Sequence, residues 1–232
     1  QALRYAEKIN EDILSPAEKD SINFQKGYAY CRKKENNKAK NYLEKVDLDG
    51  TYGNQAKYYL GYISYANNDY TQANEYFANV ESVEKYQERM GYYKADMQFK
   101  SGNFDKAVEE GLAQMPKSTE AEKSELSKII GESYFNLKQY DKALPYLLAY
   151  EGKNGKLSNV DFYQLGYSYY QQKDYDKAVS EFNKIIGGND AVAQNAYYHL
   201  GESYLKLGQK TQALNAFKNA SEMDFNLQIQ ED

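Results

Sequence analysis

The sequence predicts an all-α protein, an α-solenoid of about six helical hairpins with one more helix at the N-terminus. Two observations predict this fold class. A small residue recurs at intervals of 34, 34, 36, 35 and 35 residues, and an alanine always follows it twelve positions later. A fixed period of this length is typical of stacked supersecondary units. In addition, short alternations of apolar and polar residues fall within helical periodicity, so we expect no strand.

The recurring small residues, which we call the anchors, are expected to lie within the first helix of each hairpin. The anchors are Gly27, Gly61, Ala95, Gly131, Gly166 and Gly201. The alanines that follow are Ala39, Ala73, Ala107, Ala143, Ala178 and Ala213, and one turn later come Leu43, Phe77, Gly111, Leu147, Phe182 and Phe217. Glycine within a helix costs about 1 kcal/mol relative to alanine, so its recurrence needs a packing reason. We expect the anchor to cross the second helix at the small alanine, while the bulky residue fills the wider gap.

The anchors divide the chain into units, which together form a single predicted domain spanning residues 1–232. Residues 1–14, and in particular Gln1 to Ile13, read as the second helix of a truncated preceding repeat. The predicted repeats span approximately 15–53, 54–87, 88–123, 124–158, 159–193 and 194–227.

Helix start signals agree with this division. Ser15 precedes Pro16, a favourable pair for an N-cap and the first helical position. Thr119 and Ser158 each have a carboxylate three residues later, as in a capping box. Turn residues lie between units at 49–50, 153–155 and 187–190.

The position nine residues after each anchor is aromatic in four of the six units. These residues are Asn36, Tyr70, Phe104, Tyr140, Tyr175 and Lys210. We expect the aromatic ones to plug the corner of the hairpin. Pro145 is expected early in a second helix, where a missing N–H is tolerated.

Composition excludes several classes of function. The net charge of −5 and the pI near 5.2 argue against non-specific nucleic-acid binding. No apolar run approaches 18 residues, which argues against membrane insertion. One cysteine, Cys31, and one histidine, His199, cannot supply a disulfide or a Cys/His zinc site, and a Cys–His catalytic pair is not expected. We predict no metal, no cofactor and no enzymatic activity.

Several motifs together resemble the tetratricopeptide repeat. They are the Leu-Gly pair at 60–61, 165–166 and 200–201, the tyrosine three residues after four of the anchors, the Asp-Tyr turn, and the later Ala and Phe. The resemblance covers about Ser15 to Asn226. It departs from the family at the position four before the anchor, which is aromatic only at Phe162 and Tyr197, and in the scarcity of the closing proline.

The resemblance implies a right-handed solenoid in which the first helices line a concave face. The exposed positions would be three and two before the anchor and one and four after it. Tyrosine is frequent there, and it offers a large contact area at a small entropic cost. The predicted binding residues are Phe24, Tyr28, Tyr58, Tyr59, Tyr62, Tyr65, Tyr92, Tyr93, Phe99, Phe135, Tyr163, Tyr167, Tyr170 and Tyr198.

The function implied is that of a scaffold that binds a protein or peptide partner on this tyrosine-rich face. One subset of the family holds a partner's C-terminal carboxylate with Lys, Asn and Arg, and this clamp is absent here, because those places carry Tyr, Asp and Glu with the single Lys128. Two alternatives stay open. Any one tyrosine could pack against a neighbouring repeat, and the array could serve as a structural spacer or self-association module that forms a homodimer through exposed repeat ends.

Composition rich in Lys, Asn and Tyr is similar to that of bacterial repeat proteins, and the chain reads as a fragment of a longer one. By analogy with such arrays we expect the bacterial periplasm or cell envelope as its location, with the cytoplasm as the alternative.

Overall fold

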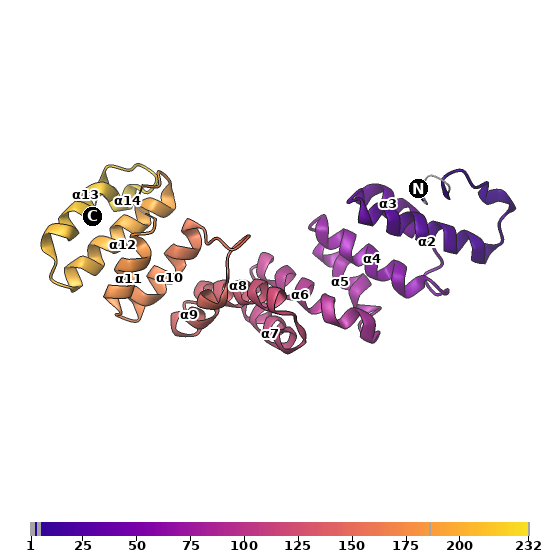
Figure 1. Cartoon of the computed structure of the whole chain (residues 1–232), viewed down its shortest axis with the longest axis horizontal. Helices are drawn as coiled ribbons and strands as arrows, with labels where there is room; N and C mark the ends of the chain where they lie inside the picture. The colour runs from indigo at the N-terminus through magenta and orange to yellow at the C-terminus, as the bar shows by residue number, and fades with distance from the viewer. Residues whose placement is uncertain (1–2, 4–5, 186, 232) are drawn as a thin grey trace. The chain divides into compact units, whose positions relative to one another are not determined.

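The computed structural model describes residues 3, 6–185 and 187–231, and this part of the chain folds into helices without a β-strand (Figure 1). The all-α prediction is confirmed. In the same residues, no helix has the length and apolarity needed to cross a bilayer. The elements are η1 (Glu11–Ile13), α2 (Pro16–Arg32), α3 (Asn36–Leu43), α4 (Gly53–Ala66), α5 (Tyr70–Ala78), α6 (Glu84–Lys100), α7 (Phe104–Gln114), η2 (Met115–Lys117), α8 (Glu120–Asn136), α9 (Tyr140–Ala149), α10 (Asn159–Gln171), α11 (Tyr175–Phe182), α12 (Ala191–Lys206), α13 (Lys210–Ser221) and α14 (Leu227–Glu231).

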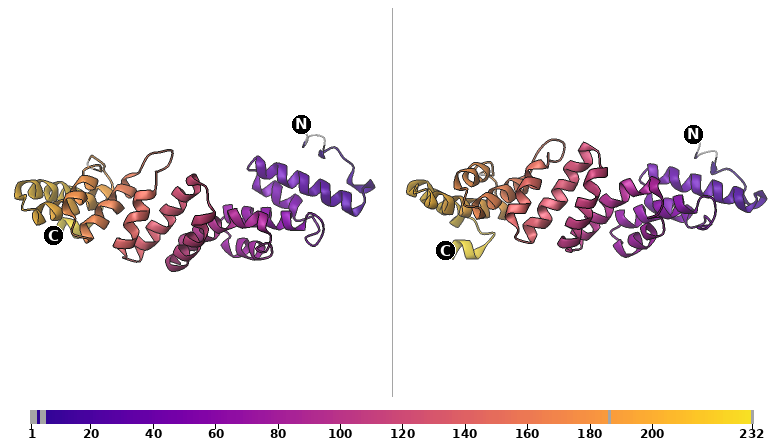
Figure 2. Two further views of the ribbon diagram at one scale, coloured as in Figure 1. Left: turned by 60° about the horizontal axis from the view of Figure 1, so that its bottom comes forward. Right: turned by 90° about the horizontal axis from the view of Figure 1, so that it is seen from below.

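Consecutive helices pair as hairpins, as the repeat predicts. Helices α2 and α3, α4 and α5, α8 and α9, α10 and α11, and α12 and α13 pack against each other in pairs, and the pairing can be followed in Figure 2. Every anchor lies in the first helix of its pair or, for Ala95, in α6.

The hairpins form two compact units, residues 1–97 and 98–232, which are divided within α6. In the first unit, Leu43, Leu60 and Ile63 belong to one buried cluster and Phe77 and Met97 to the next. In the second unit, two buried clusters are centred on Phe182, Ile185 and Leu200, and on Ala143, Leu147 and Leu165. The expectation of one domain stays a prediction, and each unit is described by itself below.

The predicted N-terminal helix is wrong for its second half. Residues 1, 2, 4 and 5 lie outside the described part, while residues 3 and 6 are helical. The helix ends there, and the chain continues through turns into η1. Beyond the break, the Oδ1 of Asn10 accepts a hydrogen bond from the backbone N–H of Asp12 at 3.0 Å. Such a local bond competes with helix propagation.

The predicted helix starts are confirmed. Ser15, Thr119 and Ser158 are N-caps whose hydroxyls accept a hydrogen bond from the backbone N–H three residues on, and each has the reciprocal carboxylate bond of a capping box. These caps satisfy N–H groups that the first helical turn leaves without partners. They explain why α2, α8 and α10 begin where they do.

Each hairpin turns through one residue in the left-handed conformation, seven positions after the anchor. These residues are Lys34, Asn68, Gly102, Lys138, Lys173 and Gly208, with φ between 59° and 75°. The second helix then starts two residues later in every case. The aromatic residues expected at the corner are thus the first residues of the second helices. Three of them, Phe104, Tyr140 and Tyr175, contact the ring five positions earlier.

The glycine anchors pack directly against the bulky residue of the second helix. The repeat pattern instead predicts packing against the alanine one turn earlier. A Cβ placed on Gly61 or Gly166 would lie 2.6 Å or 2.7 Å from Cε1 of Phe77 or Phe182. Both rings are fully buried. The anchor position is therefore small because an aromatic ring occupies the space that a side chain would take.

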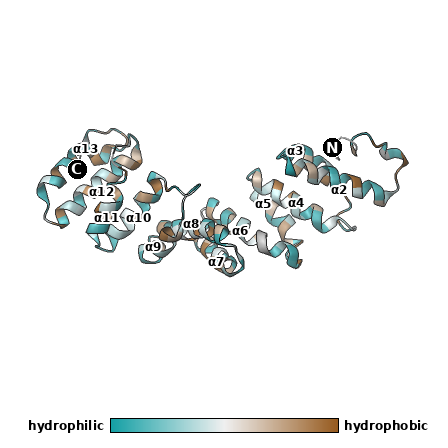
Figure 3. Cartoon of the chain, in the orientation of Figure 1, coloured by the Kyte–Doolittle hydropathy of each residue, from teal (hydrophilic) through white to brown (hydrophobic). Residues whose placement is uncertain are grey.

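Many residues along the helices are hydrophilic (Figure 3), in line with the mean hydropathy of −0.90.

One expectation about the second helices is wrong. Pro145 lies inside α9, as its sixth residue, rather than in the first turn. Because proline has no backbone N–H, α9 lacks the hydrogen bond that another residue at this position would donate.

Candidate protein-interaction surface

The first helices of neighbouring hairpins lie against each other within each unit. Helix α2 contacts α4 in the first unit, and α10 contacts both α8 and α12 in the second. Equivalent positions of these helices therefore form rows. We use the name first-helix face for the residues at three and two positions before the anchor and at one and four positions after it.

In the first unit, this face carries a connected group of aromatic rings. Phe24 stacks on Tyr28 at 6.3 Å between ring centroids, and Tyr28 contacts Tyr59 at 5.2 Å. Tyr28 is 36% exposed, and Phe24 and Tyr59 are half-buried. The structure brings together these three predicted residues from α2 and α4.

An open pocket of about 250 Å³ lies among these rings. Its lining consists of Tyr28, Cys31, Arg32, Tyr58, Tyr59, Tyr62 and Tyr93. The pocket has room for a single side chain of a ligand rather than for a drug-sized molecule. Arg32, the one charged residue of this lining, is exposed at the rim.

Tyr58 is mainly a core residue, contrary to its predicted place on the open face. Its side chain is 6% exposed, stacks on Tyr86 at 4.6 Å and contacts Phe77. The physical reason is its position. A residue three before the anchor points toward the following hairpin, where the apolar side chain of a neighbour covers it.

The remaining predicted residues of the first unit are half-buried and contact each other. Tyr93 contacts Tyr62, Tyr65 and Tyr92 at centroid distances of 5.8, 4.8 and 5.9 Å. The hydroxyl of Tyr65 also donates a hydrogen bond to Asp96 at 2.6 Å. These tyrosines thus pack between repeats and border the open face at the same time.

In the second unit, a second group of rings surrounds Tyr167. This ring contacts Phe135 at 5.8 Å, Tyr163 at 5.9 Å, Tyr170 at 6.1 Å and His199 at 4.8 Å. The five side chains come from α8, α10 and α12 and are half-buried. The predicted residues Phe135, Tyr163, Tyr167 and Tyr170 are therefore brought together.

Two predicted residues lie apart from this group. Phe99 packs against Phe104, at the turn between α6 and α7. Tyr198 contacts Phe217 and lines a separate open hollow of about 880 Å³ on the last hairpin. The hollow also has Leu205, Leu214 and Ile229 in its lining.

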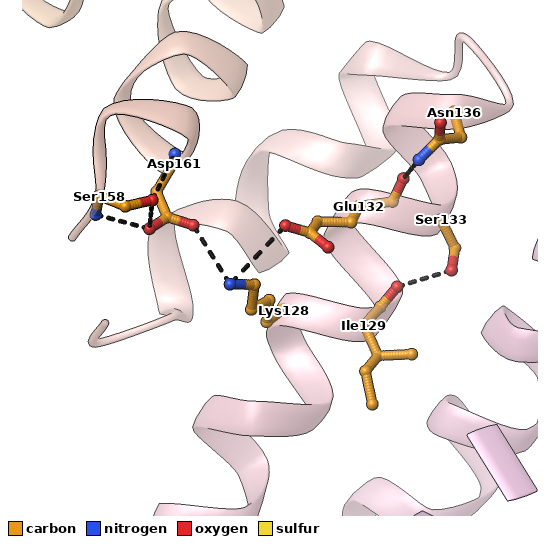
Figure 4. Close-up of polar contacts among 7 residues, drawn as sticks. All are labelled: Lys128, Ile129, Glu132, Ser133, Asn136, Ser158 and Asp161. Atoms are coloured by element: carbon orange, nitrogen blue, oxygen red, sulfur yellow. Dashed lines mark hydrogen bonds and ion pairs between the residues drawn. The ribbon is translucent and has the colours of Figure 1, made fainter. Parts of the chain in front are cut away.

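Carboxylates flank the second group of rings. Glu202 Oε2 lies 2.6 Å from Nδ1 of His199, so these two side chains share a hydrogen bond. Figure 4 shows the other carboxylates, with Lys128 between Glu132 and Asp161. The Lys128 Nζ lies 3.9 Å from Glu132 Oε1 and 3.7 Å from Asp161 Oδ1, longer than the usual charge-assisted hydrogen bond.

Burial changes the protonation of several of these groups. Burial first, and then Asp161, raises the pKa of Glu132, against the opposing effect of Lys128. Burial lowers the pKa of Lys128, but Glu132 and Asp161 together outweigh it and raise that pKa. Burial raises the pKa of Cys31 to about 11, so its thiol stays protonated and is poorly suited to act as a nucleophile.

Tyrosine hydroxyls on the first-helix face of both units also keep their protons at neutral pH. Burial, followed by the neighbouring Tyr28, raises the pKa of Tyr59 to about 12. Burial and then Glu202 raise the pKa of Tyr170 to about 12. Both hydroxyls are hydrogen-bond donors at neutral pH.

Sequence reasoning missed part of the surface. Tyr52 stacks on Phe24 at 5.1 Å from the residue just before α4, where the repeat pattern gives no signal. Tyr140 contacts Tyr167 at 5.3 Å, although the pattern placed it only at the hairpin corner. Within the described residues, no group of three or more His, Cys, Asp or Glu side chains is arranged to hold a metal ion.

Comparisons with known families match two parts of the chain. The model described as "Tetratricopeptide repeat" matches residues 20–47, and that described as "Anaphase-promoting complex, cyclosome, subunit 3" matches residues 150–220. No curated protein sequence matches the chain significantly.

Solved structures share the fold at low sequence identity. The C-terminal part of a TPR repeat-containing protein from Cytophaga hutchinsonii is similar with a TM-score of 0.66 and 17% identity, over 99% of this chain and 92% of that one. MamA of AMB-1 is similar with a TM-score of 0.62 and 19% identity, over 74% of this chain and 91% of MamA. A tetratricopeptide repeat protein from Parabacteroides merdae has a TM-score of 0.51 and 15% identity, over 92% and 97% of the two chains. Together with the six repeats in register, these findings show that the chain has the helical-hairpin fold of the tetratricopeptide-repeat structures and that residues 20–47 match the repeat itself.

Proposed function

We propose that this protein is an interaction scaffold whose first-helix face binds a segment of a partner protein. One observation carries the proposal, the 250 Å³ pocket among Tyr28, Tyr59, Tyr62 and Tyr93 in the first unit. Tyrosine lining of this kind offers apolar area and hydrogen-bond donors at little conformational cost. The ring group around Tyr167 supplies a similar surface in the second unit.

The ring contacts also preorganise the surface. Each tyrosine of the face is held by at least one neighbouring ring, as Tyr28 is by Phe24 and Tyr59. Binding a partner there orders few side chains that are not already ordered. Such preorganisation lowers the entropic cost of association.

The proposal is tested by selecting from an unbiased display library of 12-residue peptides on the wild-type chain. Tyr62→Leu and Tyr167→Leu remove a hydroxyl and a ring from the two units while they keep an apolar side chain. Each variant is expected to weaken the selected peptides of its own unit by about tenfold or more. Tyr146→Leu is the matched control, because Tyr146 lies in the second helix α9 and contacts Tyr134.

If the library yields no binder, or if the control weakens binding as much as the other variants, the first-helix face is not the binding surface. Circular dichroism of all variants separates loss of binding from loss of folding.

Self-association is a second candidate function, and the 880 Å³ hollow on the last hairpin favours it. Leu205 and Leu214, which line it, are 52% and 69% exposed. Glu202 and Lys218 lie in the same lining, so a second copy related by a two-fold axis could pair opposite charges there. Sedimentation velocity over a hundredfold concentration range tests this idea. Dimers that Leu214→Glu abolishes would support it, and a wild-type chain that stays monomeric would exclude it.

A further inference from the structure

The second unit places a ring between two carboxylates in one row of its first-helix face. The position one residue after the anchor is Glu132 in α8, Tyr167 in α10 and Glu202 in α12. Because α10 contacts both α8 and α12, this row runs from one acid across the ring to the other. The equivalent positions in the first unit are Tyr28, Tyr62 and Asp96, and Asp96 accepts a hydrogen bond from Tyr65, so the acid–ring–acid order is found only in the second unit.

The negative charge of this row is incompletely compensated. Glu132 is 9% exposed, and its cationic neighbour Lys128 lies at 3.9 Å and is shared with Asp161. The other carboxylate, Asp161, already accepts hydrogen bonds from the backbone N–H and the hydroxyl of Ser158 at 2.7 and 2.6 Å. One ammonium group therefore serves two carboxylates. Such an arrangement leaves a buried carboxylate short of a counter-charge.

A second observation points to a missing hydrogen-bond donor at the same place. The Gln164 side chain is a neighbour of the Glu132 carboxylate and lowers its pKa, and this side chain is 9% exposed. Its Oε1 is buried and has no hydrogen-bond partner among the described residues. Buried polar atoms are nearly always paired, so an orphan acceptor beside an under-compensated carboxylate indicates a site for a donor with positive charge.

The rings complete the requirements for a cation. Tyr167 is half-buried, lies within contact distance of Phe135, Tyr163 and Tyr170, and supplies the row with aromatic faces. A guanidinium group stacks on such faces and pairs with carboxylates in the same plane, whereas an ammonium group is more strongly hydrated. An anionic ligand would repel Glu132, and a neutral donor could satisfy the acceptor on Gln164 but would supply no counter-charge to Glu132.

We propose that the row formed by Glu132, Tyr167 and Glu202 receives an arginine side chain of the partner segment. This inference rests on the proposed function and names the chemistry of its ligand in the second unit. The guanidinium would stack on Tyr167 and pair with a flanking carboxylate. The partner segment would therefore be basic, in keeping with the acidic pI of the scaffold.

The proposal is tested with four pools of 12-residue peptides that carry a fluorescent label and have chemically blocked termini. The pools are identical except that two fixed positions carry Arg, Lys, Gln or Glu. The wild-type chain is expected to bind the Arg pool most tightly, the Lys pool more weakly, and the Gln and Glu pools at least about tenfold more weakly than the Arg pool.

Two near-isosteric variants then locate the site. Glu132→Gln and Glu202→Gln are each expected to weaken the Arg pool about tenfold, with little change for the Gln pool. Glu109→Gln is the matched control, because it removes the same charge from an exposed position of α7. Loss of the Glu132 charge relieves an under-compensated carboxylate, so this variant is expected to stay folded.

The outcomes separate this inference from the proposed function. Binding of the Gln or Glu pool as tight as that of the Arg pool, with loss in Tyr167→Leu, overturns the cation site and leaves the peptide scaffold intact. Undiminished Arg-pool binding by both Glu variants also overturns the cation site. If none of the pools binds to the wild-type chain, the inference and the scaffold function fail together.

Discussion

The hydroxyl of Tyr65 donates a hydrogen bond to Oδ2 of Asp96 at 2.6 Å, and this contact links α4 to α6. It joins the first helices of successive repeats in the first unit through a buried carboxylate and a half-buried ring. Neither residue belongs to the repeat pattern that defines the hairpins. The contact therefore adds a specific polar link to an interface that the apolar positions already form.

Removal of this hydroxyl is expected to destabilise the first unit. Tyr65→Phe keeps the ring contacts and deletes the bond to a charged acceptor, so we expect the free energy of unfolding to fall by about 1–2 kcal/mol. Urea denaturation followed by circular dichroism measures the change. Tyr70→Phe is the control, since its hydroxyl bonds Asn68 at 2.9 Å in an exposed setting and should cost less than about 0.5 kcal/mol. Equal effects of the two variants would contradict the argument.

A methyl group at an anchor is expected to damage the hairpin core. In Gly166→Ala the new Cβ would lie 2.7 Å from the ring of Phe182, which is fully buried and has little room to move. Overpacking of this kind costs about 1–3 kcal/mol. The loss should shrink in the double variant Gly166→Ala/Phe182→Leu relative to the sum of the single ones, and a double-mutant cycle in urea checks this coupling. Strict additivity would show that the ring does not cause the damage.

Glycine at a hairpin turn is expected to stabilise the protein. Lys138 has a φ of 59° and is exposed, so its side chain contributes strain rather than packing. Glycine removes about 1–2 kcal/mol of this strain from the folded state. Its greater freedom in the unfolded chain lowers the stability by about 0.5–1 kcal/mol. A gain of about 0.5 kcal/mol in the free energy of unfolding should result. By contrast, Lys218→Gly within α13 should cost about 1 kcal/mol, and a loss of stability in both variants would refute the turn argument.

Alkaline pH is expected to weaken the fold. Burial raises the pKa of Tyr59 and of Tyr170 to about 12, and burial and then the Asp96 hydrogen bond raise that of Tyr65. Above pH 10 the unfolded chain releases tyrosine protons while the folded chain keeps them, so the free energy of unfolding falls as the pH rises. Below pH 10 these groups bind the same protons in both states and the contribution is complete.

Urea midpoints between pH 8.5 and 11, with tyrosinate absorbance at 295 nm, check this prediction. The variant Tyr59→Phe/Tyr170→Phe should show a shallower decline above pH 10. A wild-type midpoint that is constant up to pH 11 would contradict it.

The hairpins could be predicted from the sequence alone because their signals are local. Ser15, Thr119 and Ser158 cap their own helices through residues three positions away, and the anchor and the following alanine are set by one period. The exception at Asn10 is also local, but its turn-forming side chain competes with a helical pattern that seemed continuous. The same period also predicted which residues of the first helices lie on the first-helix face.

Only the tertiary structure determines how deeply each of these side chains is buried. Tyr58 and Phe24 both lie three positions before their anchors, yet Tyr58 is 6% exposed in the core and Phe24 is half-buried. The neighbouring hairpin makes the difference, and its side chains are not part of the local pattern. The shared ammonium of Lys128 and the orphan acceptor of Gln164 arise in the same way, from residues more than thirty positions apart. A sequence period assigns a residue to a face of its helix, but burial and charge compensation depend on what packs against that face.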